Sequence, residues 1–451
     1  MPRYSFAAFL ILLTGSAFLV VENSVSAGDD NNDEEFIMHE WGTFTTFSGS
    51  DGVFLDFRPL AAEHKDLPEY VMDRANFSRI GTLAKSRLRG RVRMETPVAY
   101  FYTDRIRTVE VSVDFPKGLL TEFYPPVQEI KPAFDSKVAF KEGEPVGNSS
   151  LNWGKVDLIP QSALVPQVAD EELRESIASQ MMNNVVPHGS NEHHYAQARN
   201  TDSALVHTRQ QQKGPFLTPV QGCFEKFLFY RGVGSFELPV ATVFDGDATA
   251  FVNRGEHSIS GAILIENRGH QISATEIGEI APGERVTFNP ATRMNMEDLA
   301  ALVQRTLEAE GLYRKEASSM VNTWRNSWFK EEGRRVLYIV PGQVTDELLP
   351  LHIKPAPQES LRVLVGRMEI MSPTDEAELT SLVEQSIQSR ARFEADNPRQ
   401  RNEPQPVYPV PKSIQRWGRM TEPALVRVSK VADDLAIQRE AGKLLATLRK
   451  N

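Results

Sequence analysis

The chain has 451 residues, a formal net charge of −10 at pH 7 and a single cysteine, Cys223. The acidic balance argues against a general nucleic-acid binder, whose footprint is strongly basic, so we expect no nucleic-acid partner. One cysteine cannot form an intramolecular disulfide, and the length, enough for two or three domains, allows large cores without such a cross-link.

The N-terminus has the three parts of a secretory signal peptide, which we place at residues 1–27. Arg3 supplies the positive charge, residues 6–21 form an apolar run, and Val25-Ser26-Ala27 is a small-residue cleavage site. The run is short for a membrane span, which needs about 20 apolar residues, and an uncleaved anchor is the alternative. We therefore expect a periplasmic or secreted protein with no membrane span after signal cleavage.

Residues 28–35 read as an acidic tether, and residues 36–290 as a β-rich region. Its first strand, over 36–47, places His39 and Trp41 on one face and Glu40 on the other, because side chains alternate along a strand. Further short alternating segments, separated by turn signals every 8–12 residues, predict an antiparallel β-sandwich-like N-terminal region.

A polar insert near 160–219 interrupts this pattern. Four of the nine histidines lie between positions 188 and 207. A long irregular segment within a compact protein is either functional or disordered, so this insert is a candidate for the site.

At Asn295 the hydrophobic period changes from two to 3.6, and Leu299, Leu302, Val303 and Leu307 form one helical stripe. We therefore predict an α+β part over 291–400. The nearly continuous apolar runs 336–340 and 361–371 predict buried strands, and Ser372 with Pro373 predicts the start of a long helix. A proline-rich linker at 401–411 and a helical tail at 412–451 follow. The predicted fold class is α+β, with a β-sandwich-like N-terminal region and a C-terminal helix–strand–helix part.

Five basic residues occupy alternate positions before and at the start of a predicted strand: Lys85, Arg87, Arg89, Arg91 and Arg93. On a strand they share one face. This stripe either binds an anionic polymer such as an acidic or sulfated glycan, or is a solvated face whose charges discourage edge-to-edge pairing.

Several longer strings resemble a group of uncharacterised exported bacterial proteins. They are His39-Glu40-Trp41-Gly42-Thr43-Phe44, Met94-Glu95-Thr96-Pro97-Val98, residues 229–234, residues 323–329 and residues 363–367. The resemblance covers most of the mature chain. It implies secretion, and the group has no established activity, so no residue role comes from it.

The histidines permit a metal-assisted hydrolase. His39 would bind Zn²⁺ or another divalent metal together with His193 and His194, or with one of them and Asp202. The general base acting on a bound water would be one of three carboxylates: Glu40, Glu95 or Glu122. The identity of any cofactor stays open.

A metal-free hydrolase or lyase acting on an extracellular polysaccharide is the second hypothesis. Glu40 and Glu95 would act as general acid and general base, which requires carboxyl groups about 5–9 Å apart. Trp41 and Tyr230 would stack on sugar rings. Arg231 completes the residues that we expect in an active site, if there is one.

The third and favoured hypothesis is a binding or envelope-associated scaffold protein with a glycan or envelope-protein partner. It fits the lack of a familiar catalytic string, since the sequence has no Gly-x-Ser-x-Gly elbow, no His-Glu-x-x-His helix, no phosphate loop and no dinucleotide fingerprint. The hypotheses differ on whether His39 meets the segment 188–207 in space.

Overall fold

The computed structural model describes residues 35–58, 67–74, 88–133, 147–165, 168–187, 194–208, 222–246, 248–288, 292–399, 404 and 406–449. The predicted signal peptide and all of the tether except Glu35 lie outside these ranges. From Phe36 onward the chain forms one compact unit, and its described part is α+β, as the sequence predicts.

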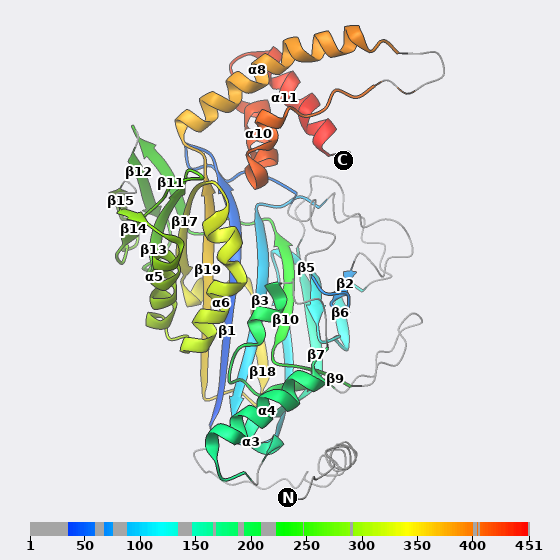
Figure 1. Cartoon of the computed structure of the whole chain (residues 1–451), viewed down its shortest axis with the longest axis vertical. Helices are drawn as coiled ribbons and strands as arrows, with labels where there is room; N and C mark the ends of the chain where they lie inside the picture. Colours follow the sequence, from blue (N-terminus) through cyan, green and yellow to red (C-terminus); the bar gives the residue numbers. More distant parts are fainter. Residues whose placement is uncertain are drawn as a thin grey trace, which may run out of the picture. The chain divides into compact units, whose positions relative to one another are not determined.

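A ten-stranded sheet is the main element, with strands from both halves of the chain (Figure 1). Its strands in spatial order are β16 (Thr292–Met294), β14 (Ile272–Ile277), β13 (Ala262–Asn267), β17 (Gly333–Val340), β19 (Glu359–Ile370), β1 (Phe36–Ser48), β3 (Val92–Thr103), β10 (Leu228–Gly234), β5 (Gly118–Tyr124) and β2 (Met72–Asp73).

The first strand lies in the middle of this sheet, between β3 and β19. It pairs antiparallel with β3 and parallel with β19, in a register that sets Ile37 opposite Glu359 and Ser48 opposite Ile370. On the far side, β19 pairs with β17 and β17 with β13. The expected boundary near residue 290 therefore does not separate two sheets, because strands from before and after it alternate in a single one.

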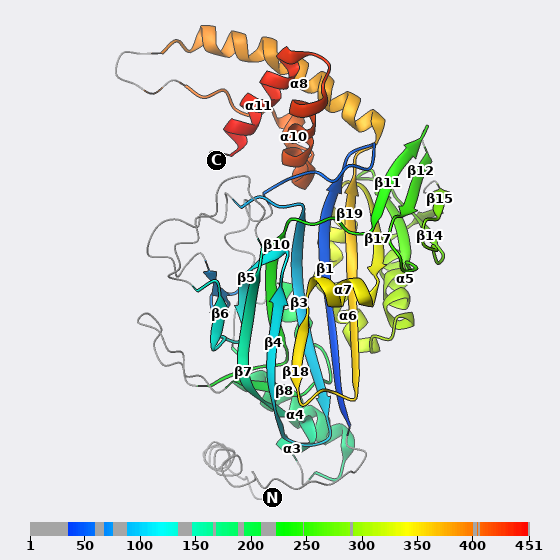
Figure 2. The ribbon, with the colours of Figure 1, turned by 180° about the vertical axis from the view of Figure 1, so that it is seen from behind.

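A six-stranded sheet packs on one face of the large sheet, and a three-stranded sheet lies beside it. The six strands are β18 (Leu351–Lys354), β4 (Arg107–Phe115), β7 (Ser149–Ile159), β8 (Leu205–Thr208), β9 (Cys223–Glu225) and β6 (Glu129–Lys131); the three are β11 (Val240–Asp245), β12 (Ala248–Asn253) and β15 (Arg285–Phe288). Met38 and Phe44 of the large sheet share one apolar core with Val111 and Trp153 of the six-stranded sheet. Figure 2, seen from behind, shows β4, β7 and β18 over this face.

Most of the helices cover the opposite face and one end of the large sheet, but the helix that contains Val344 and Leu348 packs in the core shared with the six-stranded sheet. The helical segments are α3 (Gln161–Leu164), α4 (Glu171–Val185), η2 (His194–Arg199), α5 (Met296–Ala309), α6 (Arg314–Arg325), η3 (Asn326–Lys330), α7 (Gly342–Leu348), α8 (Pro373–Asp396), α9 (Lys412–Gln415), η4 (Gly418–Met420), α10 (Thr421–Val431) and α11 (Leu435–Leu448). Trp41 shares one apolar core with Leu299 of α5 and with Met320 and Trp324 of α6. None of the described helices is long and apolar enough to cross a membrane.

The long helix α8 begins where the sequence predicts. The Ser372 hydroxyl accepts a hydrogen bond from the Asp375 N–H, the Asp375 carboxylate accepts one from the Ser372 N–H, and Pro373 occupies the first turn. Together with α10 and α11 it buries a separate apolar core that includes Phe47 and Phe57 from the N-terminal part. The predicted helical tail is therefore packed against the rest of the unit.

A β-bulge in β3 changes which residues of that strand share a face. Val98 of β3 lies opposite Trp41 of β1, and Glu95 lies opposite Thr43. β3 therefore has one residue more than β1 between these two pairs. Within this bulge, Thr96 has φ 51°. Because of this extra residue, Glu95 and Val98 both lie on the helix-covered side although an odd number of positions separates them.

Candidate functional site

The alternation of β1 separates the two residues on which the sequence analysis concentrates. His39 lies on the face that α6 covers, and Glu40 lies on the face toward the six-stranded sheet. The sequence predicts this separation correctly. The two side chains therefore belong to different environments and cannot act on the same atom.

His39 is buried, with an exposed fraction of 1%, in a cluster of polar and aromatic groups from β3 and α6. Its Nδ1 lies 2.8 Å from Oε2 of Glu316, whose other oxygen accepts a hydrogen bond of 2.8 Å from the Tyr102 hydroxyl. The rings of Tyr102 and Tyr313 contact the imidazole. Among the described residues, Nε2 of His39 has no hydrogen-bond partner.

The histidines of the polar insert do not join His39 in this cluster. His193 lies outside the described residues, and the ring of His194 contacts Trp324, with ring centroids 5.4 Å apart. In the part of the chain that the structure describes, no group of three histidine, cysteine, aspartate or glutamate residues is placed to hold a metal ion. The segment 194–208 does reach α6, where Ser319 donates a hydrogen bond to the Asn200 carbonyl.

Glu40 is fully buried and paired on both carboxylate oxygens. The Tyr230 hydroxyl donates to Oε1, and Nε of Arg362 donates to Oε2 at 2.7 Å. Burial and the adjacent charge of Glu40 raise the pKa of Tyr230 well above its usual value, so this hydroxyl stays protonated and remains a donor. Arg362 also pairs with Asp346 at 2.8 Å. Glu40 is thus the centre of an ion-paired network.

The two aromatic residues expected to stack on sugars are both enclosed. Trp41 packs against Tyr100, and Tyr230 packs against Trp153, with ring centroids 6.1 Å and 6.2 Å apart. Both side chains have an exposed fraction of 0%. Neither ring presents a face to a sugar in this structure.

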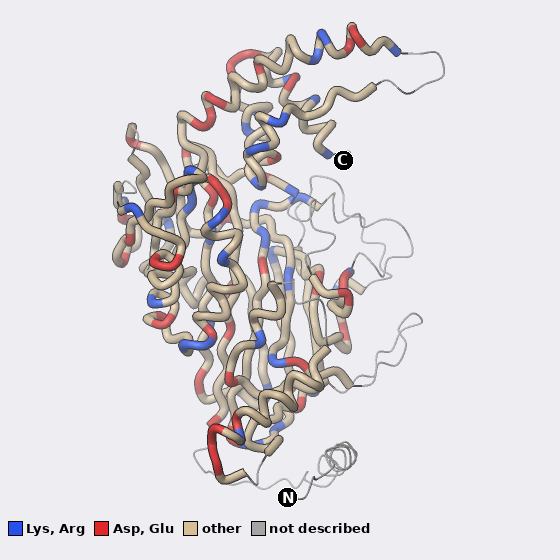
Figure 3. The backbone as a smooth tube through the Cα atoms, in the orientation of Figure 1, with Lys and Arg blue, Asp and Glu red and all other residues tan. Residues whose placement is uncertain are grey.

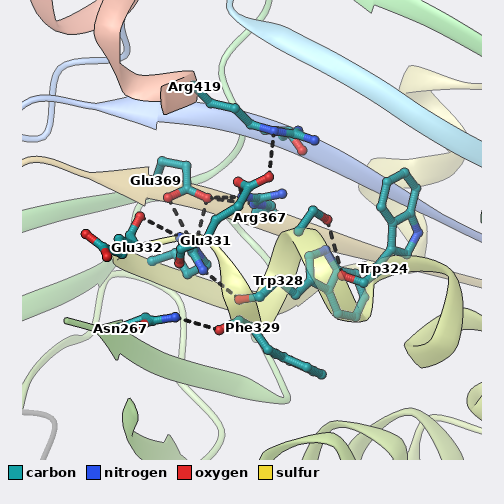
Figure 4. Close-up of polar contacts among 12 residues, drawn as sticks. Asn267, Trp324, Trp328, Phe329, Glu331, Glu332, Arg367, Glu369 and Arg419 are labelled. Carbon is teal, nitrogen blue, oxygen red and sulfur yellow. Dashed lines mark hydrogen bonds and ion pairs between the residues drawn. The ribbon is translucent and has the colours of Figure 1, made fainter. Parts of the chain in front are cut away.

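Glu95 belongs to a chain of ionised groups that crosses four neighbouring strands on the helix-covered face. Figure 4 labels Glu331, Arg367, Glu369 and Arg419 among its members. We call this set the charge belt; its members are Arg93, Glu95, Glu331, Arg335, Arg367, Glu369 and Arg419. Arg93, Glu95, Arg335, Arg367 and Glu369 are buried strand residues. The belt has four arginines and three glutamates, so nearly every buried charge is neutralised within it.

The links of the charge belt are short and continuous. Nε of Arg335 lies 3.0 Å from Oε1 of Glu369, which also accepts from Nε of Arg367 at 2.6 Å. Arg367 reaches Glu331 at 2.8 Å, and Arg419 from η4 bridges Glu331 and Glu95, at 3.2 Å each. Ion pairs thus connect β17 at one end of the belt with β3 at the other.

The charge belt holds Glu95 and Glu369 ionised. Burial raises the pKa of Glu95, but the charges of Arg93, Arg419 and Arg367 together with the Thr45 hydroxyl overcome that effect and lower it to about 2. For Glu369, burial acts in the same upward direction, and Arg335 and Arg367 again bring the pKa below its usual value. A general acid or base works best with a pKa near the operating pH, so neither carboxylate is suited to proton transfer near pH 7.

One end of the belt caps the π-helical segment η3. Arg335 donates to the carbonyls of Trp328, Glu331 and Glu332, and Asn267 donates to the carbonyl of Phe329. These carbonyls lie where the helix ends and have no helical partners of their own. Arg335 therefore has a clear structural role.

Arg231 lies on the next strand beyond β3, in a separate pair. Its Nη2 is 3.2 Å from Oε1 of Glu122 on β5, and both residues have exposed fractions of 1%. Because side chains alternate along β10, Arg231 lies on the same helix-covered face as Phe229. Of the expected catalytic residues, Glu95 and Arg231 thus share a face, and Glu40 lies on the other.

Several partners in these networks were not identified from the sequence. Arg362, Arg367 and Glu369 interrupt the run 361–371, which the sequence identifies as a buried strand. A charge within such a run indicates a buried partner, and this signal could have located the belt. Nothing in the sequence near Glu316 pointed to His39.

The basic stripe is also different from the expectation. Arg93 is buried against Glu95, and Arg91 is partly exposed and pairs with Asp56 and Glu237. The strand begins only at Val92. Lys85 and Arg87 lie outside the described residues.

Comparisons with known proteins give little guidance. No family model and no curated protein matches the chain. Among solved structures, the Fcho1 Mu homology domain (Danio rerio) with bound Eps15 peptide is similar at 6% identity over 75% of this chain and 97% of that one, with a TM-score of 0.25. The yeast delta-COP-I mu-homology domain complexed with Dsl1 WxWxV peptide is similar at 7% identity over 75% of this chain and 98% of that one, with a TM-score of 0.23. Scores this low carry no argument.

Proposed function

We propose that this chain is an exported, non-catalytic binding or scaffold protein of the bacterial cell envelope. One observation carries the proposal. The carboxylates that the sequence offers as acid and base, Glu40 and Glu95, are buried and bonded to cations of the same chain. Such pairs fix a structure, and removing either partner leaves an unpaired charge in the interior.

Export follows from the signal-like residues 1–27 and from the resemblance to exported proteins, and a periplasmic or secreted location follows from export. The partner is a glycan or a protein of the envelope, and the packed sheets supply a rigid frame for it. The net charge of −10 favours such a partner over nucleic acid.

The test combines a binding assay with an activity screen on the purified mature protein. We expect the wild type to sediment with isolated cell-envelope material and to release no product from ester, peptide or polysaccharide substrates. The matched variants are His39→Asn and Glu40→Gln, checked for folding by circular dichroism. Product released by the wild type and lost in either folded variant would contradict the proposal, as would a wild type that stays entirely in the supernatant.

A hydrolase centred on His39 is the second candidate, because one observation favours it. Glu316 orients Nδ1 of His39, and Nε2 has no partner among the described residues. A carboxylate behind an imidazole is the usual arrangement for a metal-binding histidine, whose other nitrogen faces the ion. A bound Zn²⁺ or similar cation would supply a water of lowered pKa.

Elemental mass spectrometry separates the two candidates. Stoichiometric metal in the wild type, absent from His39→Ala and reduced in Glu316→Gln, would support the hydrolase. Metal-free wild-type protein would remove the metal-assisted form of this candidate. Glu276→Gln is a suitable control, because this exposed carboxylate lies on the distant strand β14.

A further inference from the structure

The proline-rich segment that the sequence predicts leads from the end of α8 to α9, and the structure describes its residues 404 and 406–411. Residues 404–411 contain four prolines and no charged residue. In Figure 3 the chain that leaves the grey trace and runs back to the C-terminal helices is therefore tan. A connection between two helices needs length, but it needs neither this stiffness nor this lack of charge.

The prolines restrict the backbone to an extended conformation. Each proline ring fixes its own φ at about −65° and excludes the α region for the residue before it. Tyr408 and Val410 precede Pro409 and Pro411, so all four residues are restricted in this way. Pro411 has φ −57° and ψ 141°, close to the values of a polyproline II helix. The segment therefore has little conformational freedom to lose.

Two side chains attach this segment to the helical core. Tyr408 and Val410 are buried among the side chains that α8, α10 and α11 enclose. The Tyr408 ring packs against Phe393, with centroids 5.6 Å apart, and the guanidinium of Arg390 lies 4.6 Å from its centre. The Val410 carbonyl accepts a hydrogen bond of 2.7 Å from the Gln415 side chain. The backbone is thus fixed on both sides of the proline between these two residues.

Another edge of the segment is exposed. A polyproline II helix has three residues per turn, so Pro406, Pro409 and Lys412 lie along one edge. All three are exposed, and Val407 beside them has an exposed fraction of 56%. The protein thus presents two proline rings and an aliphatic side chain, followed by an ammonium group at the start of α9.

This edge has the chemistry of a ligand for a groove lined by aromatic side chains. Proline-rich segments bind in such grooves of partner proteins, and a backbone that is already extended loses less entropy on binding. A glycan is a poorer match. Its hydroxyl groups need hydrogen-bond partners when they are buried, and the proline positions of this edge have no backbone N–H to donate.

We propose that the exposed edge at Pro406, Val407 and Pro409 docks into an aromatic-lined groove of a cell-envelope protein, with Lys412 opposite a carboxylate at the end of that groove. The proposal deepens the proposed binding function and rests on it, because it assigns the partner to the proteins of the envelope rather than to its glycans. It also gives the connection between α8 and α9 a role beyond joining two helices.

Sedimentation with isolated cell-envelope material tests the proposal on the mature protein. We expect the double variant Pro406→Ala/Pro409→Ala to bind roughly tenfold more weakly than wild type. Both replaced side chains are exposed, so the variant should remain folded, which circular dichroism checks. Pro282→Ala is the matched control and should bind like wild type, because this exposed proline lies in the turn before β15, away from the segment (Figure 1).

Two further measurements define the partner. A synthetic peptide of residues 404–412 should release the bound protein, and the same peptide with its four prolines replaced by alanine should not. Envelope material whose proteins have been digested with proteinase K should no longer bind the wild type.

A photo-crosslinker tests the groove itself. With p-benzoyl-L-phenylalanine in place of Val407, we expect a crosslink to an envelope protein at or next to a tryptophan, tyrosine or phenylalanine. The same group in place of Val431, which is 51% exposed on α10, should not reach that site. Crosslinks from Val407 only to sites without a neighbouring aromatic residue would contradict the proposed groove.

The remaining outcomes separate this inference from the proposed function. Wild-type affinity in the double variant, or equal release by the all-alanine peptide, would show that the proline edge is not the docking surface. Binding that persists after proteinase digestion would identify a glycan partner and overturn the inference, while the proposed function would stand. A wild type that binds no envelope material would overturn the proposed function, and this inference with it.

Discussion

At the scale of single residues, the interior of this protein depends on paired charges. Glu95 accepts from Arg93, Arg419 and Thr45, and Glu40 accepts from Arg362 and Tyr230. Desolvating a charge costs several kcal/mol unless good partners compensate, so each group depends on its neighbours. Single substitutions in these pairs are therefore informative.

We predict that Glu95→Gln lowers the free energy of unfolding at pH 7 by about 3–5 kcal/mol, the range for removing one partner of a buried ion pair. The pKa of Glu95 is about 2 in the folded state, against an ordinary value of 4.5. Its charge thus stabilises the fold above pH 4.5, and the stabilisation is lost as the pH falls from 4.5 to 2. Urea unfolding across this range should show the difference between wild type and variant shrinking. Glu110→Gln, on the exposed side of β4, should stay within about 0.5 kcal/mol of wild type.

Lys226 gives a pH dependence of opposite sign. Burial lowers its pKa to about 8, against an ordinary 10.5, so between these values the unfolded chain binds the extra proton and the folded chain does not. Stability from this group therefore rises with pH from 8 to 10.5, by up to about 3 kcal/mol. Lys226→Met should remove that rise in urea titrations at pH 8 and pH 10. Lys155→Met, at an exposed site of β7, is the control and should keep the rise. If Lys226→Met showed a rise as large as that of wild type and of this control, the assignment would be wrong.

At the scale of elements, close approach between neighbouring strands fixes specific residues. Gly366 of β19 lies directly opposite Tyr338 of β17, and the tyrosine ring occupies the space above it. A Cβ added at Gly366 would lie 2.2 Å from Cζ of Tyr338, which is far inside van der Waals contact. The glycine is needed here for space.

We predict that Gly366→Ala destabilises the protein by about 1–3 kcal/mol or more through overpacking of this buried site. Tyr338→Leu should restore part of the loss in the double variant, because the shorter side chain leaves room for the methyl group. Gly342→Ala is the matched control, since no atom lies within 4 Å of its added Cβ. Equal Tm values for Gly366→Ala and Gly342→Ala would refute the packing argument.

The elements themselves could be predicted because their signals are local. Apolar runs gave the strands later found as β17 and β19, the periodicity near Leu299 gave α5, and Ser372 with Pro373 gave the start of α8. The sequence could not predict which of these elements pack against one another. The sequence around His39 carries no trace of Glu316, since their contact exists only because α6 packs on β1 and β3.

At the scale of the whole molecule, the two halves of the chain form one sheet. β1 and β3 come from the first hundred or so residues, and β19 and β17 from the last third, yet they are direct neighbours. The charge belt crosses the same four strands, and Arg419 from the C-terminal part links two of its members, Glu331 and Glu95. Cutting the chain near residue 290 would therefore divide the sheet through its centre.

We predict that residues 36–290 produced alone do not reach a folded state, because β1 loses β19 and β13 loses β17. The measurement is the dispersion of amide signals in a nuclear magnetic resonance spectrum. Co-expression with residues 291–449 is the control and should recover a soluble complex. A well-dispersed spectrum from the isolated fragment would show that the first half folds independently.

The parallel pairing of β1 with β19 also determines when the large sheet can be completed during synthesis of the chain. β1 can pair with β3 soon after the ribosome has made residue 103, but its other edge has no neighbour until residues 359–370 exist. Until then a growing chain presents an open, largely apolar central strand, on which other chains can pair. Completion of the sheet is thus delayed until most of the chain has left the ribosome, and any product that stops short of β19 is expected to aggregate or to need a chaperone.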